Sequence, residues 1–249
     1  MPSECDGPII EVERLTIGYG DTVVLENLDF GVLAGGVFAI LGGSGSGKST
    51  LLRHLIGLEQ PLSGRIRVRG APPRRDSGAP AYGVLFQSGA LFGSMTLFDN
   101  VALPLRKWTD LDARAIDTIV RSKLRLVGLE GFEHHLPAEI SGGMKKRAGI
   151  ARALALDAPL LFLDEPSAGL DPVSSAELDE LILILNHSLR MTTVVVTHEL
   201  PSIFAIASDC ILLDRGVRGI IARGNPVALR DAHDDPRVRA FFNRAPQAS

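Results

Sequence analysis

Short apolar runs rich in β-branched residues alternate with amphipathic stretches along most of the chain. The runs at 9–19, 22–30, 37–42, 64–70, 82–87, 160–164 and 192–198 predict strands, with 82–87 as a buried strand ending at Gln87. Helical spacing of apolar residues at 48–58, 111–129 and 173–189 predicts helices. Strands that alternate with helices favour an α/β fold, in which helices cover a mostly parallel sheet.

The middle of the chain, about 90–157, has helical periodicity and few β-branched runs. It predicts a helical insertion into one α/β domain that spans residues 1–249. The proline-rich stretch 71–81 reads as a surface connection. Near the end, 209–222 predicts a hairpin turned at Gly216, and 235–244 predicts a short amphipathic helix followed by a frayed end.

Composition narrows the class of protein. The 249 residues are 45% apolar and 22% charged, a balance that excludes disorder as the main state. A net charge of −3 gives no electrostatic footprint for nucleic acid, so no nucleic-acid partner is expected. Apolar runs such as 159–163 fall far short of the roughly 18 residues that span a bilayer. The N-terminus has no signal-peptide pattern, and Cys5 and Cys210 form no disulfide framework, so a cytoplasmic protein is expected.

A glycine-rich segment lies between a predicted strand and a predicted helix, and it fits the pattern G-x-x-x-x-G-K-[ST]. In such a loop the backbone amides surround phosphate oxygens, Lys48 reaches the β- and γ-phosphates, and Ser49 holds Mg²⁺. A glycine-rich turn that binds nothing is the alternative. The predicted nucleotide-binding residues are Gly42, Gly43, Ser44, Gly45, Ser46, Gly47, Lys48, Ser49 and Thr50.

Two carboxylates follow the apolar run at 160–163. A carboxylate at the end of a buried strand can hold Mg²⁺ through its water shell, which makes Asp164 the candidate metal-side residue. The next residue, Glu165, is the candidate general base that polarises the attacking water. Taken alone, the pair also fits two solvated acids at a strand end.

The segment ISGGMKKRAGIARALALDAPLLFLDEPSAGLDP, residues 140–172, resembles the ATP-binding subunits of ABC transporters, whose signature is close to L-S-G-G-Q followed by a helix. The resemblance runs from about residue 9 to 224. It implies an ABC-type P-loop NTPase with a mostly parallel core sheet, an antiparallel β region and an inserted helical subdomain. It also implies ATP and Mg²⁺ as ligands, an ATPase activity coupled to transport, and a nucleotide-binding core formed by 8–87 and 158–224. Residues 88–157 would then form the helical subdomain with the signature, and 225–249 a C-terminal tail.

The family pattern also gives roles to residues that are ambiguous by themselves. Tyr19 would stack on adenine, although a tyrosine in a strand-ending turn is commonly packing. Gln87 would reach Mg²⁺ or the attacking water, where the alternative is a solvated loop residue. His198 would bond the γ-phosphate, where the alternative is a structural histidine. Asp171, in SAGLD, also matches the family pattern and lies between Glu165 and His198 in the chain.

The signature residues Ser141, Gly142 and Gly143 are expected just ahead of a helix that begins at Met144, where exposed amides suit an anion. A helix cap by Ser141 is compatible with this role. In the family the signature of one subunit closes over the nucleotide of another, which implies a homodimer. The neighbouring run 145–147, two lysines and an arginine, is expected to be a solvated helix face.

Met144 in the signature and the segment QSGALFGSMTLFDNVALPL, 87–105, resemble the ATPases of Mla/Mce-type phospholipid transport systems. This resemblance implies inner-membrane permease subunits, an extracytoplasmic Mce-type lipid-binding protein, and a location on the cytoplasmic face of the inner membrane. Leu91, Phe92 and Phe98 are candidate permease contacts, with core packing as an equal alternative. Other possible functions are an importer ATPase for another small solute, a soluble ABC ATPase acting on DNA or ribosomes, and a regulatory nucleotide-binding module.

Overall fold

The computed structural model describes residues 7–20, 22–73, 78–232 and 234–243. The chain divides into two compact units, the first formed by Met1–Asp76 with Val194–Ser249 and the second by Ser77–Thr193. The boundary falls within β7 (Thr192–Val196), so this strand is shared by the two units. Cys5, part of the connection predicted at 71–81, and the end of the chain after 243 lie outside the described residues.

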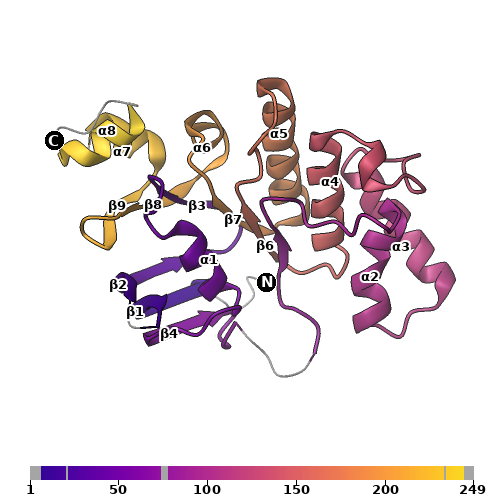
Figure 1. The fold of residues 1–249 in the computed structure, drawn as a ribbon, viewed down its shortest axis with the longest axis horizontal. Coiled ribbons are helices and arrows are strands. Elements are labelled where there is room, and N and C mark those ends of the chain that lie inside the picture. The colour runs from indigo at the N-terminus through magenta and orange to yellow at the C-terminus, as the bar shows by residue number, and fades with distance from the viewer. Residues whose placement is uncertain (1–6, 21, 74–77, 233, 244–249) are drawn as a thin grey trace, which may run out of the picture. The chain divides into compact units, whose positions relative to one another are not determined.

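An antiparallel sheet opens the first unit. The central strand β1 (Ile10–Tyr19) pairs with β2 (Thr22–Val32) on one side and with β4 (Ser63–Val68) on the other (Figure 1). The buried residues of β1 follow the two-residue period of a strand with one core face, except at a register shift between Val12 and Leu15, where the period is interrupted. These buried residues are Ile10, Val12, Leu15 and Ile17.

Strand β3 (Val37–Gly42) is buried along its whole length and takes part in parallel pairing. It runs parallel to β8 (Asp209–Asp214), and β8 turns back into the antiparallel strand β9 (Gly219–Gly224). The hairpin predicted near Gly216 is therefore confirmed. A strand buried on both faces is typical of a parallel sheet, and it leads here directly through the glycine-rich loop into α1 (Lys48–Leu55).

Three C-terminal helices pack on this part of the first unit: α6 (Leu200–Ile206), α7 (Pro226–Ala232) and α8 (Pro236–Phe242). The amphipathic helix predicted at the end of the chain is confirmed by α8, whose Val238 and Phe242 lie in one core cluster with Leu41 and Cys210. Burial and the charge of Asp209 raise the pKa of Cys210 to about 12. The thiol is therefore a protonated core residue at neutral pH.

The second unit holds the helical segment and two parallel strands. Strand β5 (Gly83–Leu85) pairs with β6 (Leu160–Asp164). Polar side chains start the helices: Thr96, Asp112, Ser141 and Asp171 each accept a backbone N–H in the first turn. The helices are α2 (Leu97–Trp108), α3 (Ala113–Leu126), η1 (Pro137–Glu139), α4 (Gly142–Ala153) and α5 (Pro172–Leu189).

The expected α/β architecture, with parallel strands, a separate antiparallel sheet and an inserted helical segment, is confirmed. The boundaries expected for the nucleotide-binding core, the helical subdomain and the tail stay a prediction. Within the described part of the chain, no helix combines the length and apolar character needed to cross a membrane.

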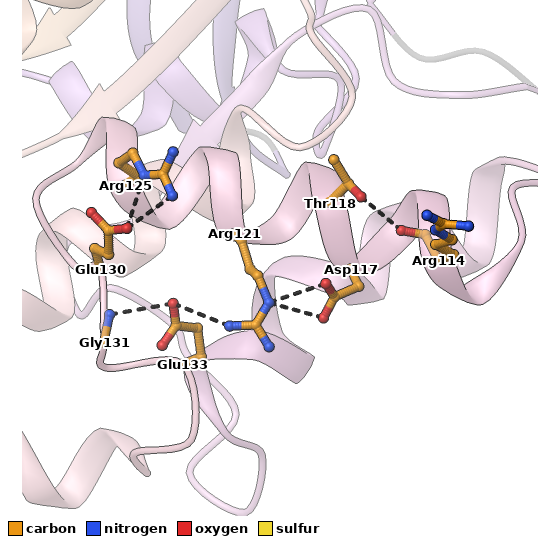
Figure 2. A network of polar contacts seen from close by, with 8 residues as sticks. All are labelled: Arg114, Asp117, Thr118, Arg121, Arg125, Glu130, Gly131 and Glu133. Atoms are coloured by element: carbon orange, nitrogen blue, oxygen red, sulfur yellow. Dashed lines mark hydrogen bonds and ion pairs between the residues drawn. The ribbon is translucent and has the colours of Figure 1, made fainter.

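An ion-pair network ties α3 to the loop that follows it (Figure 2). Arg121 donates from Nε to both carboxylate oxygens of Asp117, at 3.1 and 3.0 Å, and its Nη1 lies 3.6 Å from Oε1 of Glu133. Burial raises the pKa of Glu133, but backbone N–H donors from Glu133 and Gly131 and the charges of Arg121 and His134 outweigh it, so the pKa is lowered. The network therefore stabilises the ionised form of a carboxylate that is almost fully buried.

Replacing Glu133 with Gln is expected to lower the free energy of unfolding at pH 7 by about 1 kcal/mol, since a hydrogen-bonded charge is lost. Because the folded-state pKa is lowered, the contribution is complete above the unfolded pKa of about 4.3 and disappears as the pH falls through the folded value. Urea unfolding at pH 7 and pH 3 measures the difference. Glu130, which pairs with Arg125 on the exposed side, provides the control. Equal losses for Glu130→Gln and Glu133→Gln at both pH values would contradict this expectation.

Candidate nucleotide-binding and hydrolysis site

In the first unit the glycine-rich loop connects β3 to α1 as the sequence predicts. Gly45 and Gly47 have φ angles of +73° and +93°, a conformation that disfavours side chains with a Cβ. Gly47 is the N-cap of α1, so the helix begins at Lys48. The Lys48 ammonium folds back and donates hydrogen bonds to the carbonyls of Gly42 at 2.8 Å and Gly43 at 3.1 Å. Its charge is therefore held inside the curve of the loop.

The loop residues fit a chain of phosphate groups. The hydroxyl of Ser46 is buried and makes no hydrogen bond to any described residue, so it has capacity for a ligand oxygen. The N-terminus of α1 adds backbone N–H groups and the positive end of a helix dipole. Ser49 is exposed in the first turn of that helix. Gly43, Ser44 and Ser46 also line a cavity of about 430 Å³ with Arg215 and Arg237.

Tyr19 and Thr50 lie together in the first unit, since their hydroxyls share a hydrogen bond of 3.1 Å. Tyr19 is 49% exposed, so the tyrosine is anchored at its hydroxyl and is not a core residue. His198 is also exposed and lies two residues beyond the end of β7. Its Nε2 is 3.7 Å from Oε1 of Glu199. Both aromatic side chains thus have surface available for a ligand.

In the second unit, the two candidate carboxylates differ in their surroundings. Asp164 is the last residue of β6, and Glu165 follows it with only 8% of its surface exposed. The backbone of Glu165 has a φ of +45°, and its carbonyl accepts a hydrogen bond of 3.1 Å from the N–H of Ala168. Such left-handed backbone in a residue other than glycine is found at functional sites. The alternative of two solvated acids does not fit Glu165.

Gln87 does not end a strand, so that part of the prediction is wrong. Strand β5 stops at Leu85, and the N–H of Gly89 bonds the carbonyl of Phe86 at 2.8 Å, which closes a turn. Gln87 lies in this turn with an exposed side chain. Gly89, the last residue of the turn, has a φ of +74°, a conformation that glycine adopts readily.

The signature helix α4 begins at Gly142, two residues earlier than predicted, because Ser141 caps it by accepting a 3.2 Å hydrogen bond from the N–H of Met144. Gly142 and Gly143 therefore belong to the first turn. Ser141, Gly143 and Met144 line a cavity of about 220 Å³ together with Ser174. The cap predicted for Ser141 is confirmed, and the exposed helix start leaves its first amides near this cavity.

Asp171 caps α5. Its carboxylate accepts hydrogen bonds from the hydroxyl and N–H of Ser174 and from the N–H of Val173. The bonds from the Ser174 hydroxyl and N–H lower the pKa of Asp171. Asp171 therefore remains ionised at neutral pH and fixes the start of the helix.

The solvated face predicted for 145–147 is wrong for Lys146, which is only 6% exposed. Its ammonium donates hydrogen bonds to the backbone carbonyls of Gln87 and Glu165. Arg152, which the sequence did not single out, donates to the carbonyls of Ala90 at 2.7 Å and Gly89 at 3.3 Å. The sequence offers no signal for these contacts, because their partners are backbone atoms of residues 19 to 63 positions away in the chain.

A strand, a phosphate-binding loop with an inward lysine, and a following helix define a P-loop nucleotide-binding fold. The family model described as ABC transporter matches residues 25–168. The chain belongs to the ABC transporter ATP-binding family, and it is an ATPase of that family.

Curated relatives agree with this assignment. The chain is 43% identical over 243 residues to the probable ribonucleotide transport ATP-binding protein mkl of Mycobacterium leprae, which covers 95% of this chain and 69% of that protein. It is 41% identical over 242 residues to the intermembrane phospholipid transport system ATP-binding protein MlaF of Escherichia coli, with coverage of 94% and 88%.

Solved structures show the same fold. The structure of cbiO1 from Clostridium perfringens, part of the ABC transporter complex cbiONQ, matches with a TM-score of 0.81 at 29% identity, covering 95% of this chain and 96% of that one. The ATP-binding cassette MJ0796, solved as a dimer in a post-hydrolysis state with ADP and Pi, matches with a TM-score of 0.76 at 27% identity, covering 87% and 98%. The predicted ABC-type P-loop NTPase fold is confirmed.

Proposed function

We propose that this ATPase binds Mg-ATP through its glycine-rich loop and energises the movement of phospholipid, or a related hydrophobic substrate, across or between bacterial membranes. The observation that carries nucleotide binding is the Lys48 ammonium, held by the carbonyls of Gly42 and Gly43 inside a loop that ends at a helix N-terminus. In this position it can exchange those carbonyls for phosphate oxygens.

The nucleotide would be held by residues of the first unit. Residues 42–47 would give backbone N–H groups to the phosphates, with Lys48 on the β- and γ-phosphates. The Ser49 hydroxyl is the proposed Mg²⁺ ligand here, with Thr50 beside it, and Tyr19 would stack on adenine. Support comes from the Tyr19–Thr50 hydrogen bond, which fixes the tyrosine against the start of α1.

Hydrolysis would use the second group of predicted residues. Asp164 and the Gln87 amide would complete the Mg²⁺ surroundings, since carboxylate and amide oxygens suit this ion. When bound, Mg²⁺ neutralises charge that develops on the phosphates. Glu165 would accept a proton from the attacking water, and His198 would donate a hydrogen bond to the γ-phosphate. The burial of Glu165 directly after β6 supports this role, because its carboxylate is held at a defined position away from bulk water.

We further propose that the chain acts as a homodimer in which Ser141, Gly142 and Gly143 of one copy cover the nucleotide of the other. The exposed start of α4 and the dimeric state of the cassette with ADP and Pi support this arrangement. Residues 8–87 and 158–224 would form the nucleotide-binding core, 88–157 the helical subdomain, and 225–249 a tail.

Inner-membrane permease subunits and an extracytoplasmic Mce-type lipid-binding protein are the proposed partners, which would place the chain on the cytoplasmic face of the inner membrane. The support for phospholipid is the 41% identity to MlaF, which extends over 88% of that protein. Phe92, which is 50% exposed in the segment after Gln87, is the best available permease contact, whereas Leu91 and Phe98 are partly buried.

Another small solute is the second candidate, because the relative from Mycobacterium leprae carries a name that refers to ribonucleotide transport. The two candidates share the ATPase mechanism and differ in the cargo and in its binding protein. Only the components of the complex distinguish them.

The complex purified from detergent-solubilised membranes of the native host, with this chain as bait, should contain a permease, an Mce-domain protein and phospholipid. Mass spectrometry of both proteins and lipids measures this, and a mock purification from cells without tagged bait is the control. Recovery of a permease with a different solute-binding protein and no enriched lipid would refute phospholipid as the cargo while leaving the ATPase intact.

A further inference from the structure

Lys146 is a buried cation in a helix that carries the signature motif. It lies on α4, five residues after the cap Ser141, and 6% of its surface is exposed. A lysine ammonium is costly to bury unless hydrogen-bond acceptors replace its water. The burial of the Lys146 ammonium therefore depends on the hydrogen-bond acceptors around it.

Two backbone carbonyls accept from the Lys146 ammonium. One belongs to Gln87, and the other, at 3.3 Å, belongs to Glu165. Burial lowers the pKa of Lys146, while the negative charges of Asp164 and Glu165 act in the opposite direction. All of these residues belong to the second unit, so a single side chain joins two of the predicted hydrolysis residues.

The pairing of β5 with β6 explains how one lysine reaches both carbonyls. The parallel register places Leu85 opposite Leu163, so the two strands leave the sheet side by side. Gln87 and Glu165 each follow their paired leucine by two residues. Their backbones therefore lie next to each other at the carboxyl ends of the strands, where α/β folds place ligands.

Besides the contacts of Lys146, two further contacts hold α4 close to β5 and to the turn that follows it. A Cβ on Gly83 would lie 2.3 Å from the carbonyl oxygen of Ala153, so this contact accepts only glycine. The Arg152 guanidinium bonds the carbonyls of Gly89 and Ala90, which continue the turn that contains Gln87. Lys146 and Arg152 are thus two cations by which α4 holds this turn, and Lys146 also bonds the carbonyl of Glu165.

Holding the Glu165 carbonyl has a conformational consequence. The φ of +45° at this residue is uncommon for a side chain with a Cβ and persists only where its surroundings enforce it. The Glu165 carbonyl is bonded by Lys146 and by the N–H of Ala168. Loss of the ammonium removes one of these constraints and leaves a buried carbonyl with fewer donors.

We propose that Lys146 is a positioning residue for ATP hydrolysis, which holds the backbones of Gln87 and Glu165 at a fixed spacing and ties both to the signature helix. In this role Lys146 acts through the backbones of Gln87 and Glu165, whose carbonyls accept its hydrogen bonds. This inference rests on the role proposed for Glu165. It also means that a displacement of α4 is transmitted to both hydrolysis residues through one side chain.

The first test compares steady-state ATP hydrolysis by the full chain and by its Lys146→Met variant. The kcat is expected to fall at least 10-fold, while the KM for ATP stays within about two-fold, because the proposed nucleotide-binding residues of the glycine-rich loop are untouched. Lys146→Arg retains a cation with several donors and should recover most of the rate. Lys145→Met, the same change on the partly exposed neighbour, is the matched control and should behave as wild type.

A second measurement does not depend on ATP. Hydrogen exchange of the nucleotide-free full chain should show faster exchange at 86–90 and 165–168 in Lys146→Met, with no change at 42–49. If Lys146→Met fails to fold, Lys146→Gln, which keeps a donor amide, serves in both measurements. Unchanged kcat, a rise in KM alone, or unchanged exchange in these two segments would overturn the proposal. A wild-type chain with no ATP turnover under any condition would refute the role of Glu165, and the exchange measurement would still report on Lys146.

Discussion

Replacing Glu165 with Gln is expected to slow ATP hydrolysis by about 10²–10⁴-fold while leaving the Kd for Mg-ATP nearly unchanged. The amide keeps the size and hydrogen-bonding capacity of the side chain but cannot take a proton from water. Glu165 is buried at the end of β6, and its backbone is held by Lys146 and Ala168, so the substitution has little freedom to rearrange the site. Phosphate release measures the rate, and isothermal titration calorimetry measures the affinity.

The matched control is Glu180→Gln, on an exposed position of α5 in the same unit. It should retain the wild-type rate. Because the Glu165→Gln protein keeps ATP bound, light scattering at saturating Mg-ATP should also detect the proposed homodimer. A wild-type rate of hydrolysis in Glu165→Gln would remove Glu165 from the mechanism, whatever its association state.

Replacing Lys48 with Met is expected to weaken ATP binding by about 10- to 100-fold, which corresponds to the roughly 1.5–3 kcal/mol of hydrogen bonds to charged groups. Methionine retains much of the volume of this buried side chain but donates nothing to phosphate. The loss should be larger for ATP than for AMP, because Lys48 is placed to meet the β- and γ-phosphates. Titration of a fluorescent ATP analogue, with AMP as competitor, measures both affinities.

Lys107→Met provides a control of the same chemistry on an exposed residue of α2, and it should leave nucleotide affinity unchanged. Thermal unfolding of the nucleotide-free variants separates binding from folding, since Lys48 also bonds the carbonyls of Gly42 and Gly43. An unaltered Kd for ATP in a folded Lys48→Met protein would contradict the proposed phosphate contact.

Local sequence signals predicted much of the candidate site. The order of strand, glycine-rich loop and helix follows from residues that are neighbours in the chain, and α1 begins at Lys48 as expected. The cap at Ser141 is equally local, because its partner is the N–H of Met144. The proposed roles of Tyr19, Gln87 and His198 came from the order of family motifs and stay predictions.

Errors arose where a boundary or a burial depends on distant atoms. The sequence extended the β5 strand to Gln87, although a turn at 86–89 ends it at Leu85. The run 145–147 looked like a solvated face because charged residues usually are solvated. Lys146 is buried instead, since two carbonyls from other segments replace its water.

The sequence by itself determined the class of protein, the phosphate-binding loop and the order of the motifs, because each of these depends on spacing along the chain. Only the tertiary structure decided that Glu165 is buried in a left-handed backbone conformation and that Lys146 joins it to Gln87. The physical reason is that burial and backbone hydrogen bonding depend on how β5, β6 and α4 pack, and backbone acceptors have no residue type that a sequence could reveal.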